Sequence, residues 1–362
     1  MNRKITFLIN GLRGGGAERI CVTLANGFVD KGINVDLIVL SLDGAVRNKD
    51  LDSRVKLINL NTKNTRKSFG SIKKYIEINE VKKILVFNFQ LAILLVWIRF
   101  FIKINFQIIS RNISTLSQKS KLETNFWHKY ITHFFAKLFY NRVNKLIAQS
   151  QGMADDLIEN YRCESKKITV INNPINQKIE EYLINNKCTQ SAKNNEMLFI
   201  GRLEKVKGLE YLFEAFARLK NKEVFLRLIG EGSVEKELKE LAKSLNINDR
   251  IIFDGYKEDI IPYILKAKVT VLTSLYEGFP NALIESIALG TPVVSFDCQS
   301  GPSEIIEDGT NGFLVEYLNV EDLATMLDSA LGQEWDEKVI KESAKKYSSD
   351  GIVSRYLDVI ND

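Results

Sequence analysis

The sequence of 362 residues predicts an α/β protein built from two doubly wound domains. Two observations support this prediction. The chain is longer than one hydrophobic core usually organises. Short apolar runs of strand length also alternate with segments of helical periodicity almost throughout. Strands that are separated by helices pair in parallel, which places helices on both faces of each sheet.

The first half begins with a strand, a glycine-rich turn and a helix. Residues 5–9 form an apolar run, Gly14-Gly15-Gly16 follow, and residues 17–31 carry apolar side chains at helical spacing. Further strands of this half are expected at 35–40, 83–87, 106–110, 145–148 and 168–171.

A polar stretch separates the two halves. Residues 176–195 are rich in Asn, Lys and Gln and show no strand pattern, which is typical of a linker. The second half then resumes the alternation, with strands expected at 197–200, 225–229, 251–253, 269–273 and 292–296, and helices at 208–219 and 234–245. We therefore place an N-terminal domain at 1–175 and a C-terminal domain at 190–343.

Compartment is indicated by three features. The run 91–102 contains 12 residues and includes Arg99, whereas a spanning helix needs about 20, so we expect a buried helix there. The first ten residues hold too few apolar side chains for a signal peptide. Four scattered cysteines, at 21, 163, 188 and 298, suit a reducing compartment. We expect a cytoplasmic protein.

Charge is divided unevenly along the chain. Residues 1–190 carry 30 Lys and Arg against 15 Asp and Glu, a net charge of +15, and the remainder carries 20 against 30, a net charge of −10. A basic half indicates an anionic partner such as a membrane surface or nucleic acid. A solvated lysine-rich surface is the alternative.

The segment from Ser274 to Pro292 carries the clearest sign of chemistry. A buried strand at 269–273 ends in a turn containing Gly278, and Pro280 suits the first turn of a helix. The amides of residues 281–283 would then lack helical acceptors and would face outward at the positive end of the helix dipole. This arrangement predicts a phosphate site.

Two carboxylates accompany this helix. Glu277 lies just before it and Glu285 lies inside it. Carboxylates accept hydrogen bonds from paired hydroxyls, such as those of a ribose or hexose. The pair suits a nucleotide sugar, although two glutamates on a helix are more often solvated surface residues.

Arg202 and Lys207 form a second cluster, in a glycine-bounded loop after the strand at 197–200. The second half of the chain is acidic, so two cations placed together at the end of a strand indicate that they neutralise a bound diphosphate. Surface cations beside Glu204 are the alternative.

These motifs together resemble glycosyltransferase family 4, whose members are retaining enzymes with the GT-B fold of two facing Rossmann-like domains. The resemblance rests on seven ordered motifs and covers nearly the whole chain. The motifs are Gly14-Gly-Gly-Ala-Glu-Arg19, Gly201-Arg202 with Lys207-Gly208, Leu228-Ile-Gly-Glu-Gly232, Phe253-Asp-Gly-Tyr256, Glu277-Gly-Phe-Pro with Glu285, Gly290-Thr-Pro-Val-Val294 and Gly301-Pro-Ser-Glu-Ile305. The last segment, 344–362, resembles the terminal helix that crosses back onto the first domain.

The resemblance implies a role for each matching residue. Arg202 and Lys207 would bind and stabilise the leaving diphosphate, Glu277 would contact the donor sugar, and Glu285 would take the ribose hydroxyls. Backbone donors to phosphate would come from the stretch formed by Gly278, Phe279, Pro280, Asn281, Ala282 and Leu283. Gly255 and Tyr256 would hold the base, and Gly15 and Gly16 would approach the phosphates from the first domain. A UDP-sugar is the favoured donor, with no cofactor and no metal ion.

The acceptor is expected on the basic first half. The stretch 125–142 mixes aromatic and basic residues, and as a helix it could dock on an anionic membrane or serve as a core helix with a basic exposed side. We favour peripheral membrane contact on the inner face of the cytoplasmic membrane, because a polyprenyl-diphosphate-linked saccharide acceptor would also explain the charge. Such acceptors are typical of bacterial surface polysaccharide synthesis, of the O-antigen, capsule or lipopolysaccharide type. Arg111 and Asn112 are candidate contacts to the acceptor phosphate.

Two residue patterns are not expected to take part in catalysis or metal binding. His128 and His133 lie in the aromatic stretch, where a structural or interfacial role is favoured over catalysis. Asp50-Leu-Asp52 matches a metal-binding pattern of a different glycosyltransferase fold and is taken as surface.

Two other functions stay open from the sequence. One is a soluble glycosyltransferase of the same fold with a small-molecule acceptor. The other is a non-catalytic nucleotide or nucleic-acid binder, although no nucleic-acid-binding motif is present and we expect no nucleic-acid partner.

Overall fold

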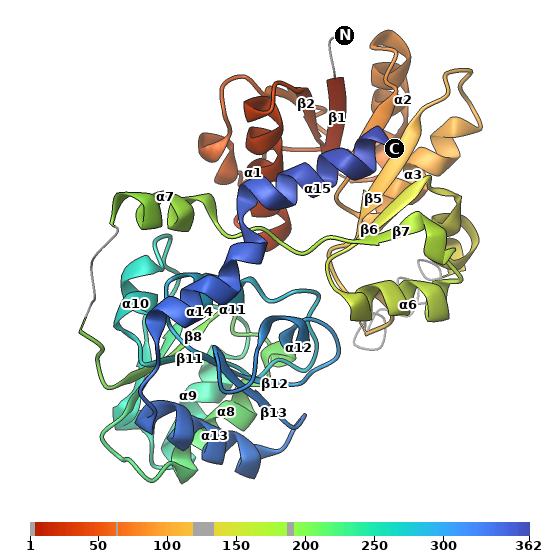
Figure 1. Cartoon of the computed structure of the whole chain (residues 1–362). Helices are drawn as coiled ribbons and strands as arrows, with labels where there is room; N and C mark the ends of the chain where they lie inside the picture. The colour runs from red at the N-terminus through yellow and green to blue at the C-terminus, as the bar shows by residue number, and fades with distance from the viewer. Residues whose placement is uncertain (1–3, 63, 119–133, 187–191) are drawn as a thin grey trace. The chain divides into compact units, whose positions relative to one another are not determined.

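The chain divides into two compact units, each with a parallel sheet. The structure, a computed structural model, describes residues 4–62, 64–118, 134–186 and 192–362. The first unit comprises Met1–Pro174 and Ser349–Asp362, and the second comprises Ile175–Ser348 (Figure 1). The expected doubly wound α/β fold is confirmed.

The sheet of the first unit has seven strands in the order β3-β2-β1-β4-β5-β6-β7. Their bounds are β1 (Lys4–Ile9), β2 (Asn34–Val39), β3 (Lys56–Asn59), β4 (Lys83–Val86), β5 (Gln107–Arg111), β6 (Lys145–Ala148) and β7 (Ile168–Val170). Every pairing is parallel. The strand β3 was not predicted, because only two of its four residues are apolar.

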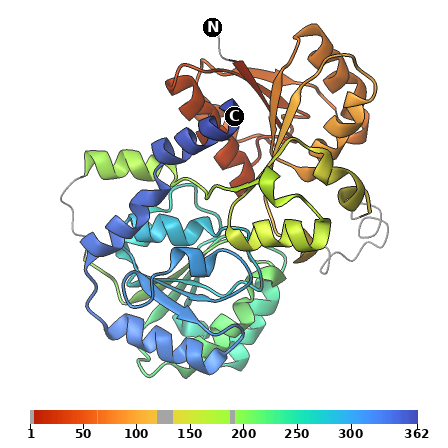
Figure 2. The same cartoon turned by 45° about the vertical axis from the view of Figure 1, so that its right-hand side comes forward.

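Helices cover both faces of this sheet. They are α1 (Gly16–Asp30), α2 (Phe69–Ile78), α3 (Phe89–Arg99), α6 (Gln151–Tyr161) and α15 (Ser349–Asn361). Alternate residues of β1 serve the two faces: Phe7 packs with α1 and α15, whereas Leu8 packs with α2 and α3. The helix α15 lies beside α1 in both views (Figures 1 and 2), and Gly27 approaches Val353 so closely that a Cβ there would lie 2.5 Å from a methyl group.

The sheet of the second unit has six strands in the order β10-β9-β8-β11-β12-β13. Their bounds are β8 (Glu196–Ile200), β9 (Phe225–Ile229), β10 (Ile251–Phe253), β11 (Val269–Leu272), β12 (Val293–Phe296) and β13 (Gly312–Val315). The surrounding helices are α7 (Gln177–Asn185), α8 (Leu209–Arg218), α9 (Glu235–Ser244), α10 (Ile261–Lys266), α11 (Asn281–Ala288), α12 (Pro302–Ile305), α13 (Val320–Gly332) and α14 (Glu337–Ala344).

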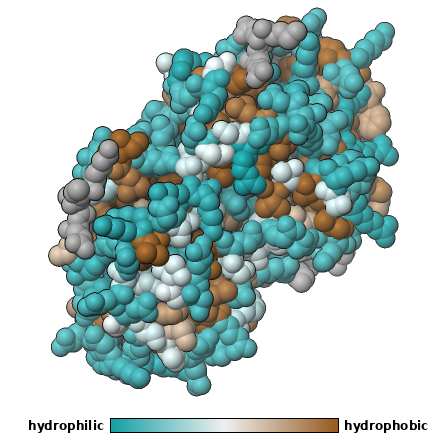
Figure 3. All heavy atoms as spheres, in the orientation of Figure 1, coloured by the Kyte–Doolittle hydropathy of each residue, from teal (hydrophilic) through white to brown (hydrophobic). Residues whose placement is uncertain are grey.

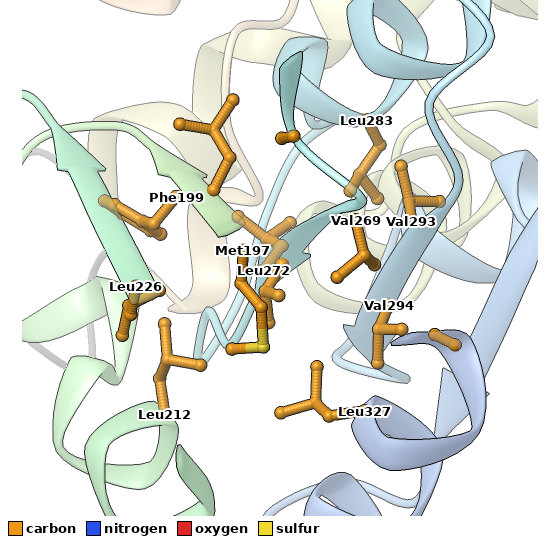
Figure 4. Close-up of a cluster of buried hydrophobic side chains, with 14 of the residues drawn as sticks. Met197, Phe199, Leu212, Leu226, Val269, Leu272, Leu283, Val293, Val294 and Leu327 are labelled. Carbon is orange, nitrogen blue, oxygen red and sulfur yellow. The ribbon is translucent and has the colours of Figure 1, made fainter. Parts of the chain in front are cut away.

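The core of the second unit forms between these layers. Side chains from the strands meet others from α8, α11 and α13, including Leu212, Leu283 and Leu327 (Figure 4). All three are fully buried. This packing fixes the carboxyl ends of the strands, from which the candidate site is built.

Both ends of the second unit differ from the sequence prediction, and its strand β13 was not predicted. The polar stretch taken as a linker contains α7, whose Ile179 is fully buried in the second core. The second unit therefore begins at Ile175 rather than at residue 190. It also retains residues 344–348, so that only α15 joins the first unit.

The surface of the molecule is mixed in character. Hydrophilic residues predominate on the face seen in Figure 3, with hydrophobic residues scattered among them. Within the described ranges, no helix has the length and apolar character needed to cross a membrane.

Candidate donor site at the carboxyl edge of the second sheet

The two predicted motifs of the second unit meet at neighbouring strands. Strands β8 and β11 pair in parallel at the centre of the sheet, so the loops that follow them leave from the same edge. The loop after β8 carries Arg202 and Lys207, and the loop after β11 carries Glu277. The amide of Leu275 donates to the carbonyl of Val206 at 2.8 Å and joins the two loops.

An ion pair joins Lys207 to Glu277. The Nζ of Lys207 lies 2.6 Å from Oε1 of Glu277, and the two side chains are only 17% and 13% exposed. The hydroxyl of Ser274 donates to the same carboxylate oxygen at 2.6 Å. A carboxylate that accepts from two donors on one oxygen is held in a fixed orientation.

The backbone of the Lys207 loop is fixed by its neighbours. The backbone carbonyl of Lys207 accepts a hydrogen bond from the hydroxyl of Thr273 at 3.0 Å. The next residue, Gly208, has a φ of +55°, and a Cβ on it would collide with the carbonyl of Thr273. Because only glycine fits this position without strain, the Gly201…Gly208 loop can lie directly against the end of β11.

Arg202 belongs to the same loop as Lys207 and is exposed. Burial raises the pKa of the Tyr276 phenol, the Glu277 carboxylate raises it further, and the Arg202 guanidinium lowers it. Tyr276 is therefore within the electrostatic reach of both residues. The site thus combines the two predicted cations with the predicted carboxylate.

The helix α11 begins beside this ion pair. Pro280 is its N-cap, with φ −76° and ψ 103°, and is not part of the first helical turn as the sequence predicted. The amide of Leu283 already donates to the carbonyl of Pro280 at 3.2 Å. Of the predicted phosphate donors, Leu283 therefore already has an acceptor within the protein, and Pro280 carries no amide hydrogen.

Glu285 lies within α11 and is 2% exposed, in contrast to the more accessible Glu277.

The loop that contains Gly301 packs against the start of α11. Gly301 has a φ of +103°, and a Cβ there would lie 2.6 Å from Cδ of Pro280, so the position favours glycine. Ser300 also donates to the carbonyl oxygens of Glu277 and Gly278, each at 3.3 Å.

The predicted base-binding residues follow β10. The amide of Gly230 donates to the carbonyl of Gly255 at 2.8 Å, and the amide of Tyr256 donates to Oε1 of Glu231 at 3.3 Å. The ring of Tyr256 is 56% exposed. These residues belong to the same carboxyl edge, two strands away from β8.

Sequence reasoning missed three residues of this edge. Ser274 orients Glu277, Glu231 holds the backbone at Tyr256, and Cys298 is a buried thiol whose pKa is raised by burial and by the Glu277 carboxylate. Only Ser274 gave a usable signal, since a hydroxyl directly after a buried strand often bonds in the following turn.

The remaining predicted residues belong to the first unit. Gly15 is the N-cap of α1 and Gly16 is its first residue. A Cβ on Gly15 would lie 2.3 Å from a carboxylate oxygen of Glu18, whose flexible side chain would have to move. Contact of these two glycines with a donor stays a prediction.

Arg111 has internal partners. It is the last residue of β5 rather than part of a turn, and it is 1% exposed. Its Nε donates to the hydroxyl of Tyr356 on α15 at 3.0 Å, and its Nη2 donates to Oδ1 of Asn173 at 2.6 Å. Asn112 is also 1% exposed, and its Oδ1 accepts from the hydroxyl of Tyr140 at 3.3 Å. These contacts stabilise the first unit, and an acceptor contact stays untested.

The two aspartates of the metal-like pattern are paired with arginines. Asp50 lies 3.0 Å from Nη1 of Arg47, and Asp52 accepts from Nε and Nη2 of Arg54 at 2.9 and 2.8 Å. Hydrogen bonding from Arg54 lowers the pKa of Asp52 to about 2. His128 and His133 lie outside the described residues.

Comparison with known proteins supports the same family for both halves. Residues 14–178 match the sequence model "Glycosyltransferase Family 4", and residues 182–347 match "Glycosyl transferases group 1". Together the two matches account for nearly the whole chain.

Two curated relatives are enzymes of bacterial glycan synthesis. One, from Campylobacter jejuni, is named N-acetylgalactosamine-N,N'-diacetylbacillosaminyl-diphospho-undecaprenol 4-alpha-N-acetylgalactosaminyltransferase; it is 31% identical over 61% of this chain and 60% of its own length. The other, lipopolysaccharide 1,6-galactosyltransferase of Escherichia coli, is 30% identical over 52% of each chain. Each match thus spans less than two thirds of the relative.

The fold is that of a solved structure along its whole length. The crystal structure of Anabaena HepE in complex with UDP aligns with a TM-score of 0.80 at 18% identity, over 99% of each chain. The two units therefore constitute the GT-B architecture.

Proposed function

Because the chain belongs to glycosyltransferase family 4, we propose that it transfers a sugar from a nucleoside diphosphate sugar, with a UDP-sugar favoured, to a lipid-linked saccharide. The observation that carries this proposal is the ion pair between Lys207 and Glu277 at the start of α11. It places a cation, a carboxylate and a helix N-terminus together, and these are the groups that a diphosphate sugar requires.

The reaction leaves negative charge on the diphosphate as the anomeric bond breaks. Lys207, Arg202 and the amides at the start of α11 provide positive charge for it in positions set by the sheet, so little reorganisation is needed as that charge develops. Binding of the phosphates would draw Lys207 away from Glu277, and the released carboxylate would then accept from the donor sugar. Glu285 would hold the ribose, and Gly255 and Tyr256 the base.

Retention of the anomeric configuration belongs to the same proposal. We assign no covalent nucleophile, and attack on the same face as the departing diphosphate accounts for retention without one. We also propose that transfer needs no metal ion, since the cations and the helix dipole supply the charge that a metal would otherwise provide. Activity that persists after chelation would support this point.

The proposed acceptor is a polyprenyl-diphosphate-linked saccharide, used in the synthesis of a bacterial surface polysaccharide. The name of the Campylobacter relative includes such an acceptor, and the E. coli relative acts on lipopolysaccharide. The net charge of +15 on residues 1–190 suits this acceptor and a peripheral position on the inner face of the cytoplasmic membrane.

Incubation with a panel of UDP-sugars and a synthetic undecaprenyl-diphosphate saccharide tests this function. We expect one donor to give a glycosylated lipid, whose new linkage has the anomeric configuration of the donor when it is examined by NMR. Transfer only to a water-soluble acceptor would replace the lipid-linked proposal with that of a soluble enzyme. Product of inverted configuration would contradict retention.

A further inference from the structure

A group of large hydrophobic side chains is exposed on the first unit. It comprises Trp97, Phe100, Phe101, Phe134 and Leu138, which we call the aromatic surface. Their exposed fractions are 39%, 62%, 59%, 60% and 50%. The sequence predicted a buried helix over 91–102, but α3 buries only one side and leaves the aromatic residues near its carboxyl end in solvent. Phe126 and Tyr130, which also belong to the aromatic and basic stretch 125–142, lie outside the described residues.

Ring and cation contacts link three of these residues, Trp97, Phe100 and Phe134, through Phe135, Phe139 and Arg142. Phe101 instead packs edge-on against Phe69 at 5.7 Å. The Trp97 ring lies 6.1 Å from that of Phe135 and 5.3 Å from that of Phe139, and Phe134 lies 6.0 Å from Phe135. The guanidinium of Arg142 stands over the rings of both Phe139 and Phe100, at 5.5 and 5.8 Å. The exposed rings therefore come from two chain segments and are held against each other.

Three cations lie close in sequence to the aromatic surface. Lys103, Lys137 and Arg142 are all exposed and lie within five residues of its members. The chain from residue 81 to 154 carries eleven Lys and Arg and a single acidic residue, Glu123. Of these cations, Arg111 is buried, and Lys83 and Lys145 donate to backbone carbonyls of α15. A protein partner with a conventional interface would meet charges of both signs, whereas this sequence of charges complements an anionic surface.

The opposite side of α3 packs into the core, which leaves the aromatic side in solvent. Leu91, Leu95 and Ile98 are fully buried in the core of the first unit. The helix has 11 residues and is too short to span a bilayer. Exposed aromatic rings flanked by lysine and arginine are suited to the headgroup layer, where the rings enter the acyl boundary and the cations meet lipid phosphates.

We propose that the aromatic surface docks the protein on an anionic lipid bilayer. This inference rests on the proposed lipid-linked acceptor and deepens it, because it assigns the membrane contact to α3 and the segment 134–142 of the first unit. The partner is the anionic phospholipid surface itself. A second copy of the chain would bury the same rings but would leave the cations facing one another.

Co-sedimentation with phosphatidylglycerol-containing vesicles tests the electrostatic part. Replacing Lys103 and Lys137 together by Gln should lower the partition coefficient about 30-fold, since each lysine near an anionic surface contributes about a factor of five. The matched control replaces the exposed Lys236 and Lys243 of the second unit by Gln, which changes net charge equally and should leave binding within about twofold.

The aromatic part is tested by a second pair of variants. Phe100→Ser with Phe101→Ser should lower the partition coefficient about tenfold even at high salt, because the lost apolar contact is not screened. Ile184→Ser, at an exposed apolar residue of α7 in the second unit, serves as the control and should change nothing. Stabilisation of each variant by UDP reports whether its donor site is intact.

The outcomes separate this inference from the proposed function. Loss of vesicle binding in both pairs, with UDP stabilisation and the controls unchanged, supports docking through the aromatic surface. Vesicle binding that is equal in wild type and all variants overturns the surface and leaves the glycosyltransferase proposal standing. A wild type that binds no anionic vesicles, or that forms a dimer dependent on Phe100 and Phe101, overturns membrane docking altogether.

Discussion

Removal of Lys207 tests whether the ion pair with Glu277 is as tight as the structure shows. At a separation of 2.6 Å the attraction is about 6 kcal/mol for an effective dielectric constant of 20, and desolvation of two side chains that are 17% and 13% exposed offsets much of it. We expect Lys207→Met and Glu277→Gln each to lower the free energy of unfolding of the second unit by about 2 kcal/mol. The double variant should lose little more, which gives a coupling energy of about 2 kcal/mol.

Urea unfolding of the four proteins measures this coupling. Trp335 reports on the second unit when Trp97 and Trp127 of the first half are replaced by Phe in every protein. The exposed Lys205, two residues before Lys207, provides the matched control: Lys205→Met should show no coupling to Glu277→Gln. A coupling below about 0.5 kcal/mol for Lys207 would refute the ion pair and the electrostatic account built on it.

Four other outcomes follow from the structure. Glu277→Gln should lower kcat with little change in UDP affinity, whereas Glu285→Gln should weaken UDP binding about tenfold or more, as one lost hydrogen bond to a charged group implies; equal effects on both would contradict the assigned roles. Gly301→Ala should lower stability by at least about 1 kcal/mol through its positive φ and its approach to Pro280, and unchanged urea unfolding would argue against this packing. Burial lowers the pKa of Lys193 to about 8. The unfolded chain keeps that proton up to about pH 10, so the free energy of unfolding should rise between about pH 8 and 10 in wild type relative to Lys193→Met; a constant difference would contradict the shift. Chelation with EDTA should leave transfer unchanged, and rescue by an added divalent ion would disprove metal independence.

Most strands could be predicted because buried parallel strands have a simple pattern. The run at 225–229 and the run at 251–253 match β9 and β10 to the residue. The short strand β3 and the helix α7 were missed because about half of the residues in each are polar, and the strand β13 was also missed. In α7, Ile179, Tyr182 and Leu183 are spaced for one helical face, which was the available signal.

The candidate site could be predicted where charged residues directly follow strands of one parallel sheet. Lys207 and Glu277 follow strands that could be placed in the same sheet, and their contact follows from the neighbouring positions of β8 and β11. Arg111 shows the limit of such reasoning. Nothing local in the sequence indicates that Tyr356, 245 residues away, accepts from its guanidinium, and the burial of the arginine depends on that partner.

The exposure of the aromatic surface could not be predicted either, because it too depends on contacts between distant segments. An apolar run of 12 residues contains no sign of which side chains a neighbouring segment will cover, and α3 could bury only those that face the sheet.

Thermal stability in the presence of UDP, GDP, CMP and ADP tests the donor site most directly. A ligand at 100 times its dissociation constant adds about 2.7 kcal/mol to the free energy of unfolding. We predict that UDP stabilises the wild type selectively and that this stabilisation is reduced in Lys207→Met but not in Lys205→Met. Stabilisation by no nucleotide, or an equal response in both variants, would contradict a nucleoside diphosphate site at the start of α11.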